Sequence, residues 1–194
     1  MELEQIKQQV LQCKKCDLYK TKKNYVFGEG NPKTEIMFIG EAPGATEDET
    51  GRPFVGRAGK ILDELLTSIG LKREDIFIAN VLKCRPPNNR NPMPDEIDAC
   101  HNYLSLQIDA IKPKIICPLG NFACEYIFKK YSIIQNVKGI SRLHGRIIKV
   151  NSIFGTITII PLYHPAVATY NVEMKTILLK DIKMINNVRL QESK

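Results

Sequence analysis

The amino-acid sequence predicts an α/β fold of three layers, in which helices cover both faces of a central, largely parallel sheet. Short runs of β-branched residues alternate with segments of helical periodicity along the chain, and this alternation is typical of sheets built from strand–helix–strand units. The 194 residues, of which 43% are hydrophobic and 25% charged, are enough to bury an ordinary core. We therefore expect a single domain over residues 1–194.

The first 13 residues are expected to form a short amphipathic helix, because Leu3, Ile6 and Val10 recur at helical spacing. This helix would end at a cysteine pair, and a loop rich in Lys, Asn and Gly follows from 20 to 33. Helical patterns return in four later segments: 57–69, 94–111, 122–131 and 172–188. Gly70 would cap the first of these four helices.

Five strands are predicted from β-branched runs that are bounded by Gly, Pro or Asn: 35–39, 75–79, 114–119, 146–150 and 156–162. In open α/β sheets, ligands bind beyond the carboxyl ends of the strands. The residues that directly follow a strand are therefore the first place to look for a functional site.

The first strand leads into a loop of Gly and Pro residues, 40–44 and 46–56. Its glycines allow the backbone to approach a ligand closely. Phe54 lies in this loop, where it would either meet a ligand or simply cover the core. The glycines fit neither the G-x-G-x-x-G dinucleotide pattern nor the phosphate-binding loop, so a nucleotide cofactor is not expected.

Two further polar residues directly follow strands. Asn80 ends the second strand, as a simple strand cap or as an amide that can pair with both a donor and an acceptor on a base edge. His164 follows the last strand. We expect Phe54, Asn80 and His164 to converge on one pocket. His101, in a helix, and His144, before a strand, are expected to be structural.

The cysteines divide into two groups. Four of them could ligate one metal centre: Cys13, Cys16, Cys84 and Cys100. The last two flank a segment with four prolines, 85–94, which cannot be regular structure and would need a staple. Zinc and a four-iron cluster both accept four thiolates, and four unrelated buried thiols remain an alternative. Cys117 and Cys124 lie in apolar segments and are expected in the core.

The charge balance points to a polyanionic partner without proving one. The chain carries 28 Lys and Arg against 21 Asp and Glu, a net charge of +7, which solubility alone could explain. The longest apolar runs, 115–120 and 153–162, are too short to cross a bilayer. The N-terminus lacks the pattern of a signal peptide, so we expect a cytoplasmic protein, associated with the nucleoid, and no membrane partner.

Four segments together resemble the iron–sulfur (family 4) uracil-DNA glycosylases: 40–44 (Gly-Glu-Ala-Pro-Gly), 51–59 (Gly-Arg-Pro-Phe-Val-Gly-Arg-Ala-Gly), 80–87 (Asn-Val-Leu-Lys-Cys-Arg-Pro-Pro) and 164–166 (His-Pro-Ala). The resemblance runs from about Cys13 to the final helix. It implies a four-stranded central sheet of the uracil-DNA glycosylase type, and an N-terminal and loop region stapled by a [4Fe–4S] cluster on the four cysteines.

The resemblance also implies an activity, the hydrolysis of the N-glycosidic bond of flipped-out deoxyuridine in DNA during base excision repair. The enzyme would be monofunctional, releasing uracil and leaving an abasic site. Uracil would be bound by Gly40, Glu41, Ala42, Phe54, Asn80 and His164. Among these, Phe54 would stack on the base, Asn80 would pair with N3–H and O4, and His164 would donate to O2. DNA would be contacted by Arg52, Arg57, Arg85 and Tyr170.

The sequence departs from the wider superfamily at two places, which affect how the attacking water is positioned and how the DNA is contacted. Relatives often carry an Asp that positions the attacking water, where this chain has Ala42. We expect a strongly dissociative reaction with loosely held water; the alternative is electrostatic help from Glu41 or Glu47. After His164, relatives usually continue to Leu-Arg, where this chain has Thr169 and Tyr170. We expect Tyr170 to enter the DNA stack, or else to cap the last helix.

Other functions remain open at this point. A glycosylase of broader range would also remove other deaminated bases, although the pairing of Asn80 suits uracil. A catalytically inactive iron–sulfur module would bind DNA without cleaving it. The protein is expected to be a monomer, and the segment 187–194 lacks the aromatic pair of a sliding-clamp docking motif.

Overall fold

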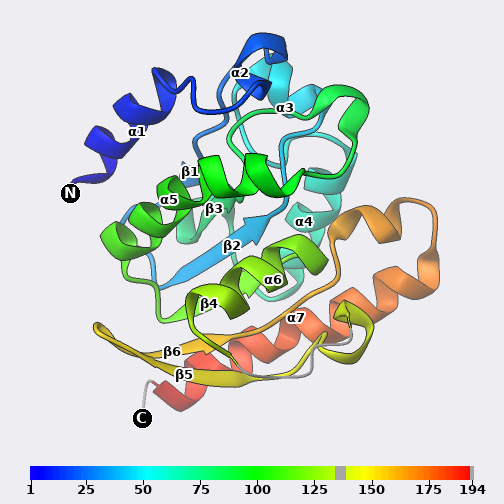
Figure 1. Cartoon of the computed structure of the whole chain (residues 1–194). Coiled ribbons are helices and arrows are strands. Elements are labelled where there is room, and N and C mark those ends of the chain that lie inside the picture. Colours follow the sequence, from blue (N-terminus) through cyan, green and yellow to red (C-terminus); the bar gives the residue numbers. More distant parts are fainter. Residues whose placement is uncertain (134–138, 193–194) are drawn as a thin grey trace.

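The computed structural model describes residues 1–133 and 139–192, and these form an α/β fold around one mixed sheet (Figure 1). The sheet has six strands in the order β1-β3-β2-β4-β6-β5. Their bounds are Glu29–Gly30 (β1), Ile36–Gly40 (β2), Phe77–Asn80 (β3), Ile115–Pro118 (β4), Ile148–Ser152 (β5) and Gly155–Ile159 (β6).

The four central strands, β3, β2, β4 and β6, run parallel to one another. They correspond to the expected four-stranded sheet, and the antiparallel strands β1 and β5 enlarge it to six at its two edges. The sequence analysis missed β1, which lies in the loop assigned to 20–33. Two residues are too short a segment to show alternation, and β1 exists only through its pairing with β3.

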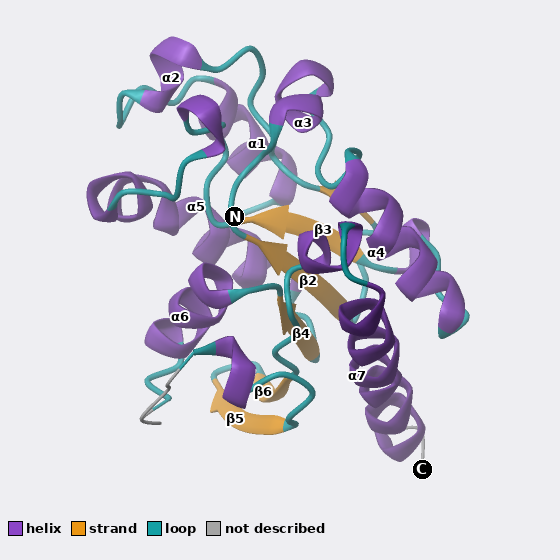
Figure 2. Cartoon of the chain, turned by 90° about the vertical axis from the view of Figure 1, so that its right-hand side faces the viewer, coloured by secondary structure: helices purple, strands orange, loops and turns teal. Residues whose placement is uncertain are grey.

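The alternation of side chains along β2 divides the interior into two layers. Met37 and Ile39 belong to a core cluster with α1 (Leu3–Leu11), α5 (Pro94–Ile111) and α6 (Asn121–Lys130). Ile36 and Phe38 face the opposite cluster, which α4 (Arg57–Ser68) and α7 (Val172–Glu192) cover. Figure 2 shows α5 and α6 on one side of the sheet and α4 and α7 on the other. The predicted three-layer architecture is therefore confirmed.

The five helices predicted from periodicity are all present, and the bounds of α5 are those expected. Two short helices were not predicted, α2 (Leu18–Thr21) and α3 (Ala45–Thr50). Segments of four and six residues hold too few turns for an apolar stripe to repeat. Within the described residues, no helix combines the length and the apolar character needed to span a membrane.

Candidate functional site

A cavity of about 460 Å³ opens at the carboxyl ends of β2 and β3 and beside the residues that follow β6. In Figure 1 the arrow of β2 points toward this carboxyl end of the sheet. Its walls come from segments far apart in the sequence: Glu41, Ala42, Pro43, Gly44, Glu47, Phe54, Arg57, Ala58, Asn80, Pro86, Asn89, Arg90, His164, Ala166, Thr169 and Tyr170. The expected convergence of Phe54, Asn80 and His164 is present.

Phe54 presents an aromatic ring from a strained loop. Its φ of 52° is in the left-handed region, which costs a non-glycine residue free energy unless its surroundings hold it there. The side chain is only 5% exposed, and its ring centroid lies 5.6 Å from that of His164. Arg73 holds the loop by donating hydrogen bonds to the carbonyls of Pro53 (3.1 Å) and Phe54.

Asn80 lies at the bottom of the cavity with an unsatisfied acceptor. It is 2% exposed, and its side-chain Oδ1 has no hydrogen-bond partner among the described residues. Such groups are rare in folded proteins because each costs about 1–3 kcal/mol. A Cβ on Gly40 would lie 2.4 Å from this Oδ1 and 2.6 Å from the Phe54 ring. Gly40, which is not itself a lining residue, therefore lets the amide and the ring approach each other.

His164 is held in one neutral form. Its Nδ1 accepts a hydrogen bond from the backbone N–H of Ala166 (3.2 Å), so the proton of the neutral ring is on Nε2. Burial lowers the pKa of His164 to about 4, and the negative charge of Glu47 opposes this shift only in part. The ring therefore offers one N–H donor at neutral pH.

The two carboxylates of the cavity have different surroundings. Glu47 accepts hydrogen bonds from the backbone N–H groups of Val55 (2.9 Å) and Gly56 (2.8 Å), so it ties α3 to the loop that carries Phe54. Burial raises the pKa of Glu41. Glu41 directly precedes Ala42 in the sequence.

Cationic and aromatic groups stand at the rim. Arg57 donates to the hydroxyl of Tyr170, and its guanidinium carbon lies 5.3 Å from the centroid of that ring. Tyr170 is 81% exposed. Arg90, which the sequence analysis did not single out, lines the cavity and pairs with the buried Glu96.

Two of the arginines predicted to contact DNA do not line the cavity. Arg52 forms an ion pair with Glu29 through two hydrogen bonds of 2.7 Å. Arg85 donates to the side chain of Asn89 at 2.8 Å. Asn89 itself is a lining residue that the sequence analysis missed. Its position, in the proline-rich segment that follows β3, was the signal available for it.

The remaining histidines have partners inside the protein. The Nδ1 of His144 lies 2.7 Å from Oδ2 of Asp181, and its ring packs on Tyr163 with centroids 4.6 Å apart. His101 is exposed on α5, with Nδ1 2.6 Å from the carbonyl of Asp98. Neither lines the cavity that contains His164, in keeping with the structural roles expected for both.

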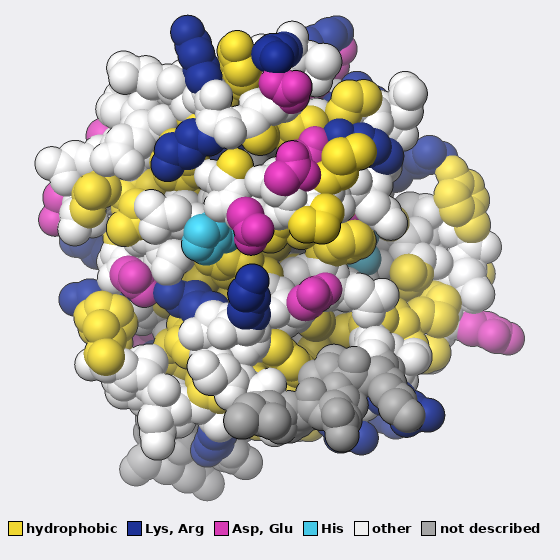
Figure 3. Space-filling model, in the orientation of Figure 1, with side chains coloured by type: hydrophobic (Ala, Val, Ile, Leu, Met, Phe, Trp, Pro, Cys, Tyr) yellow, Lys and Arg dark blue, Asp and Glu magenta, His cyan; other side chains and the backbone are white. Residues whose placement is uncertain are grey.

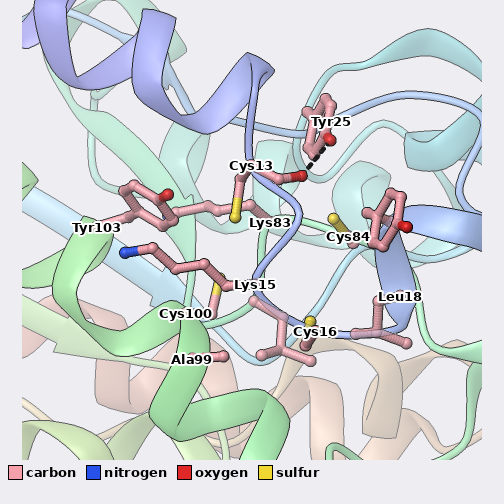
Figure 4. A pocket seen from close by; sticks show the side chains of 12 residues that line it. Cys13, Lys15, Cys16, Leu18, Tyr25, Lys83, Cys84, Ala99, Cys100 and Tyr103 are labelled. Carbon is pink, nitrogen blue, oxygen red and sulfur yellow. Dashed lines mark hydrogen bonds between the residues drawn. The ribbon is translucent and has the colours of Figure 1, made fainter.

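The cysteines separate into the two groups expected. Cys117 and Cys124 are buried in the core. The other four line one small cavity beside Tyr25, Lys83 and Tyr103: Cys13, Cys16, Cys84 and Cys100. Figure 4 shows their four sulfur atoms facing the same space.

The four thiols are spread around their cavity rather than gathered at a point. In the described part of the chain, no three Cys, His, Asp or Glu side chains are grouped so as to hold a metal ion. Burial raises the pKa of Cys84 well above its usual range and that of Cys100 to about 11. Thiols in such a setting become thiolates only if a positive centre is bound there.

Comparison with known proteins agrees with this geometry. The family model of the uracil DNA glycosylase superfamily matches residues 27–183. The chain is 47% identical over 186 residues to the type-4 uracil-DNA glycosylase of Archaeoglobus fulgidus, covering 96% of this chain and 92% of that protein. It is 49% identical over 189 residues to the type-4 enzyme of Sulfurisphaera tokodaii, covering 97% and 85%. The type-4 enzyme of Thermotoga maritima is 44% identical over 187 residues, covering 93% and 91%.

The three-layer fold, with a pocket at the carboxyl ends of its parallel strands, is thus that of the uracil DNA glycosylase superfamily. Within this superfamily, the chain belongs to the type-4 uracil-DNA glycosylases.

Proposed function

We infer that the chain is a uracil-DNA glycosylase of base excision repair, which hydrolyses the N-glycosidic bond of deoxyuridine in DNA. The observation that supports this most directly is the buried, unpartnered Oδ1 of Asn80 at the cavity that Phe54 and His164 also line. A ligand with an N–H donor on a flat ring satisfies this acceptor. Uracil has that donor at N3.

The cavity binds a base that has left the DNA stack. A base in a duplex cannot reach a pocket of this depth, so the nucleotide is flipped out first. Phe54 stacks on the flipped ring, which is worth about 1–3 kcal/mol for bases in general. Asn80 accepts from N3–H and donates to O4. Cytosine presents the reverse pattern, and a bidentate contact of this kind discriminates by roughly 1–3 kcal/mol.

His164 stabilises the leaving group. As the N-glycosidic bond breaks, negative charge develops on O2 of uracil, and the Nε2–H of the neutral imidazole donates to it. Loss of one such donor commonly costs about 10²–10³ in rate. The hydrogen bond from Ala166 to Nδ1 keeps the ring in the donating form.

The attacking water has no Asp to position it, because Ala42 occupies that place. We propose a dissociative reaction, in which the sugar becomes an oxocarbenium ion before loosely held water captures it. Glu41 and Glu47 both line the cavity and offer negative charge to that cation. Glu47 also fixes the Phe54 loop through its two hydrogen bonds to backbone amides.

The rim residues bind the DNA around the flipped nucleotide. Arg57 is placed to meet a phosphate, and the exposed Tyr170 beside it fills the space that the base leaves in the stack. Arg52 and Arg85 lie further from the cavity, where they would meet phosphates at the periphery. The protein acts as a monomer on single- or double-stranded DNA that contains uracil.

We propose that the second cavity holds a [4Fe–4S] cluster. Its ligands would be Cys13, Cys16, Cys84 and Cys100, and four thiolates are the ligand set that such a cluster takes. The thiols surround a space without forming a site for one ion, which favours a group of several irons over a single zinc. When bound, the cluster supplies cross-links between the segment before α2, the end of β3 and α5.

The activity is tested by incubating the protein with an oligonucleotide that contains one uracil, followed by alkaline cleavage at abasic sites. We expect strand cleavage with uracil and none with cytosine. The Asn80→Ala variant should lose roughly 10–200-fold in single-turnover rate, because one bidentate base contact is removed. An absence of cleavage above the no-enzyme control would contradict the proposed function. Equal cleavage of hypoxanthine and uracil would indicate a glycosylase of broader range.

A further inference from the structure

Lys83 is a buried cation for which the reaction described above has no use. It follows β3 three residues after Asn80 and directly precedes Cys84. The side chain is 1% exposed. Its ammonium group donates to the backbone carbonyl of Asn80 (2.7 Å) and to Oε1 of Gln107 (2.6 Å). It is not among the residues that line the uracil cavity.

The second partner of Lys83 is itself fixed. Gln107 is fully buried on α5 and donates through Nε2 to the carbonyl of Phe27 (2.8 Å). A chain of hydrogen bonds therefore links the carbonyl of Phe27 to Gln107 on α5, and Gln107 through Lys83 to the end of β3. In the described part of the chain, no carboxylate forms an ion pair with Lys83. An uncompensated buried ammonium costs several kcal/mol.

Lys83 also lines the cavity formed by the four cysteines, as Figure 4 shows. The backbone of Lys83 makes a hydrogen bond to Cys100. Lys83 therefore connects the wall of the cysteine cavity to the backbone at the end of β3.

The Asn80 side chain lacks one contact that could orient it, because its Oδ1 has no hydrogen-bond partner among the described residues. It lies next to Gly40 and the ring of Phe54. The direction of the amide then depends on the backbone from which it projects. Lys83 holds that backbone at the carbonyl of the same residue.

We propose that Lys83 is a positioning residue, whose ammonium fixes the Asn80 backbone so that the Asn80 amide meets the base in the pairing orientation. The proposal deepens the proposed function and rests on it.

The test compares Lys83→Met with Lys14→Met, the same substitution on an exposed lysine between the two N-terminal cysteines. Equilibrium binding is measured to an oligonucleotide with a non-cleavable 2′-fluoro-deoxyuridine and to its cytosine counterpart. We expect Lys83→Met to reduce the ratio of uracil to cytosine affinity about tenfold, the effect of one hydrogen bond to a charged group. Lys14→Met should keep the wild-type ratio, and affinity for undamaged DNA should not change in either variant.

A double-mutant cycle separates positioning from general stability. If Lys83 acts through Asn80, Lys83→Met should have almost no further effect on the ratio in an Asn80→Ala background. Additive losses, or a wild-type ratio in Lys83→Met, would overturn the proposal. Should Lys83→Met fail to fold, Lys83→Gln replaces it in both measurements, with a smaller expected loss of roughly threefold because an uncharged donor remains.

Iron content per chain is measured in every variant. Iron should stay at the wild-type level in Lys83→Met. If iron is lost, and Cys84→Ser loses discrimination to the same extent, the effect belongs to cluster binding and the positioning role is wrong. Uracil release by the wild-type protein is scored separately, so failure of the proposed function is distinguished from failure of this inference.

Discussion

At the scale of single residues, His164 shows how one backbone contact selects a chemical role. The imidazole has two nitrogens, and the N–H of Ala166 occupies Nδ1. The proton must then be on Nε2 when the ring is neutral. Burial keeps the ring neutral by lowering the pKa of His164 to about 4. A donor without positive charge suits the reaction proposed above, in which the sugar becomes cationic.

The same shift makes the stability of the protein depend on pH. Between the ordinary pKa of 6.5 and the folded value of about 4, the unfolded chain binds more protons at this residue than the folded chain does. The free energy of unfolding should therefore fall as the pH drops through this window. Urea unfolding between pH 7.5 and pH 4.5 measures it. His164→Gln should flatten the dependence, and the exposed His101→Gln should not. A wild-type slope in His164→Gln would contradict the assignment.

At the scale of elements, the loop between α3 and α4 is the part of the pocket that is held most firmly. Glu47 accepts from the amides of Val55 and Gly56, and Arg73 donates to the carbonyls on the other side of the turn. Arg73 is itself oriented by Asp63 at 2.6 Å. These bonds offset the cost of the left-handed conformation at Phe54, so the ring is fixed before a base arrives.

Gly59, in the first turn of α4, packs closely against the backbone of Phe54. A Cβ on Gly59 would lie 1.7 Å from the carbonyl oxygen of Phe54. Gly to Ala inside a helix normally stabilises by about 1 kcal/mol, but Gly59→Ala should destabilise by roughly 1–3 kcal/mol because the loop must move. Uracil release should fall as well.

Thermal unfolding and single-turnover rates measure both effects of Gly59→Ala. Thr67→Ala, on the exposed side of the same helix, is the control and should leave both unchanged or slightly raise stability. A Gly59→Ala protein as stable and active as wild type would show that the loop tolerates displacement.

At the scale of the whole molecule, the charge balance is positive. The face shown in Figure 3 mixes Lys and Arg with Asp and Glu side chains. The net charge of +7 therefore adds a general, salt-dependent attraction to DNA phosphates. Arg57 and Arg90 line the pocket, and we propose that such cations supply the specific contacts to DNA.

The cysteine cavity connects parts of the molecule that the sheet does not. Purified protein should contain about four irons and four sulfides per chain and absorb visible light, as expected for a cluster on four thiolates. Cys84→Ser should lose this absorbance and lower the Tm by roughly 5–10 °C, a loss of about 2–3 kcal/mol. Cys124→Ala, in the core, should keep the absorbance. One zinc per chain without colour would overturn the cluster.

Much of this molecule could be predicted from short stretches of sequence. Helical periodicity identified the five longer helices, because one buried face imposes a regular apolar pattern. Runs of β-branched residues identified five of the six strands. The short elements α2, α3 and β1 have no such pattern and depend on their neighbours. Phe54, Asn80 and His164 were suggested by their positions after predicted strands, and family resemblance suggested their roles.

The sequence by itself determined the layers of the fold, the family and the residue types available to the pocket. Only the tertiary structure decided which polar groups have partners. Arg73 holds the Phe54 loop, and Lys83 joins the end of β3 to Gln107 on α5. The empty acceptor on Asn80 and the tautomer of His164 depend on which groups lie within hydrogen-bonding distance in the folded chain. Hydrogen bonds depend on distances of a few tenths of an ångström and on the exclusion of water. The spacing of residues in the sequence predicts which face of an element a residue occupies. The distances between polar atoms are set only when the elements pack together.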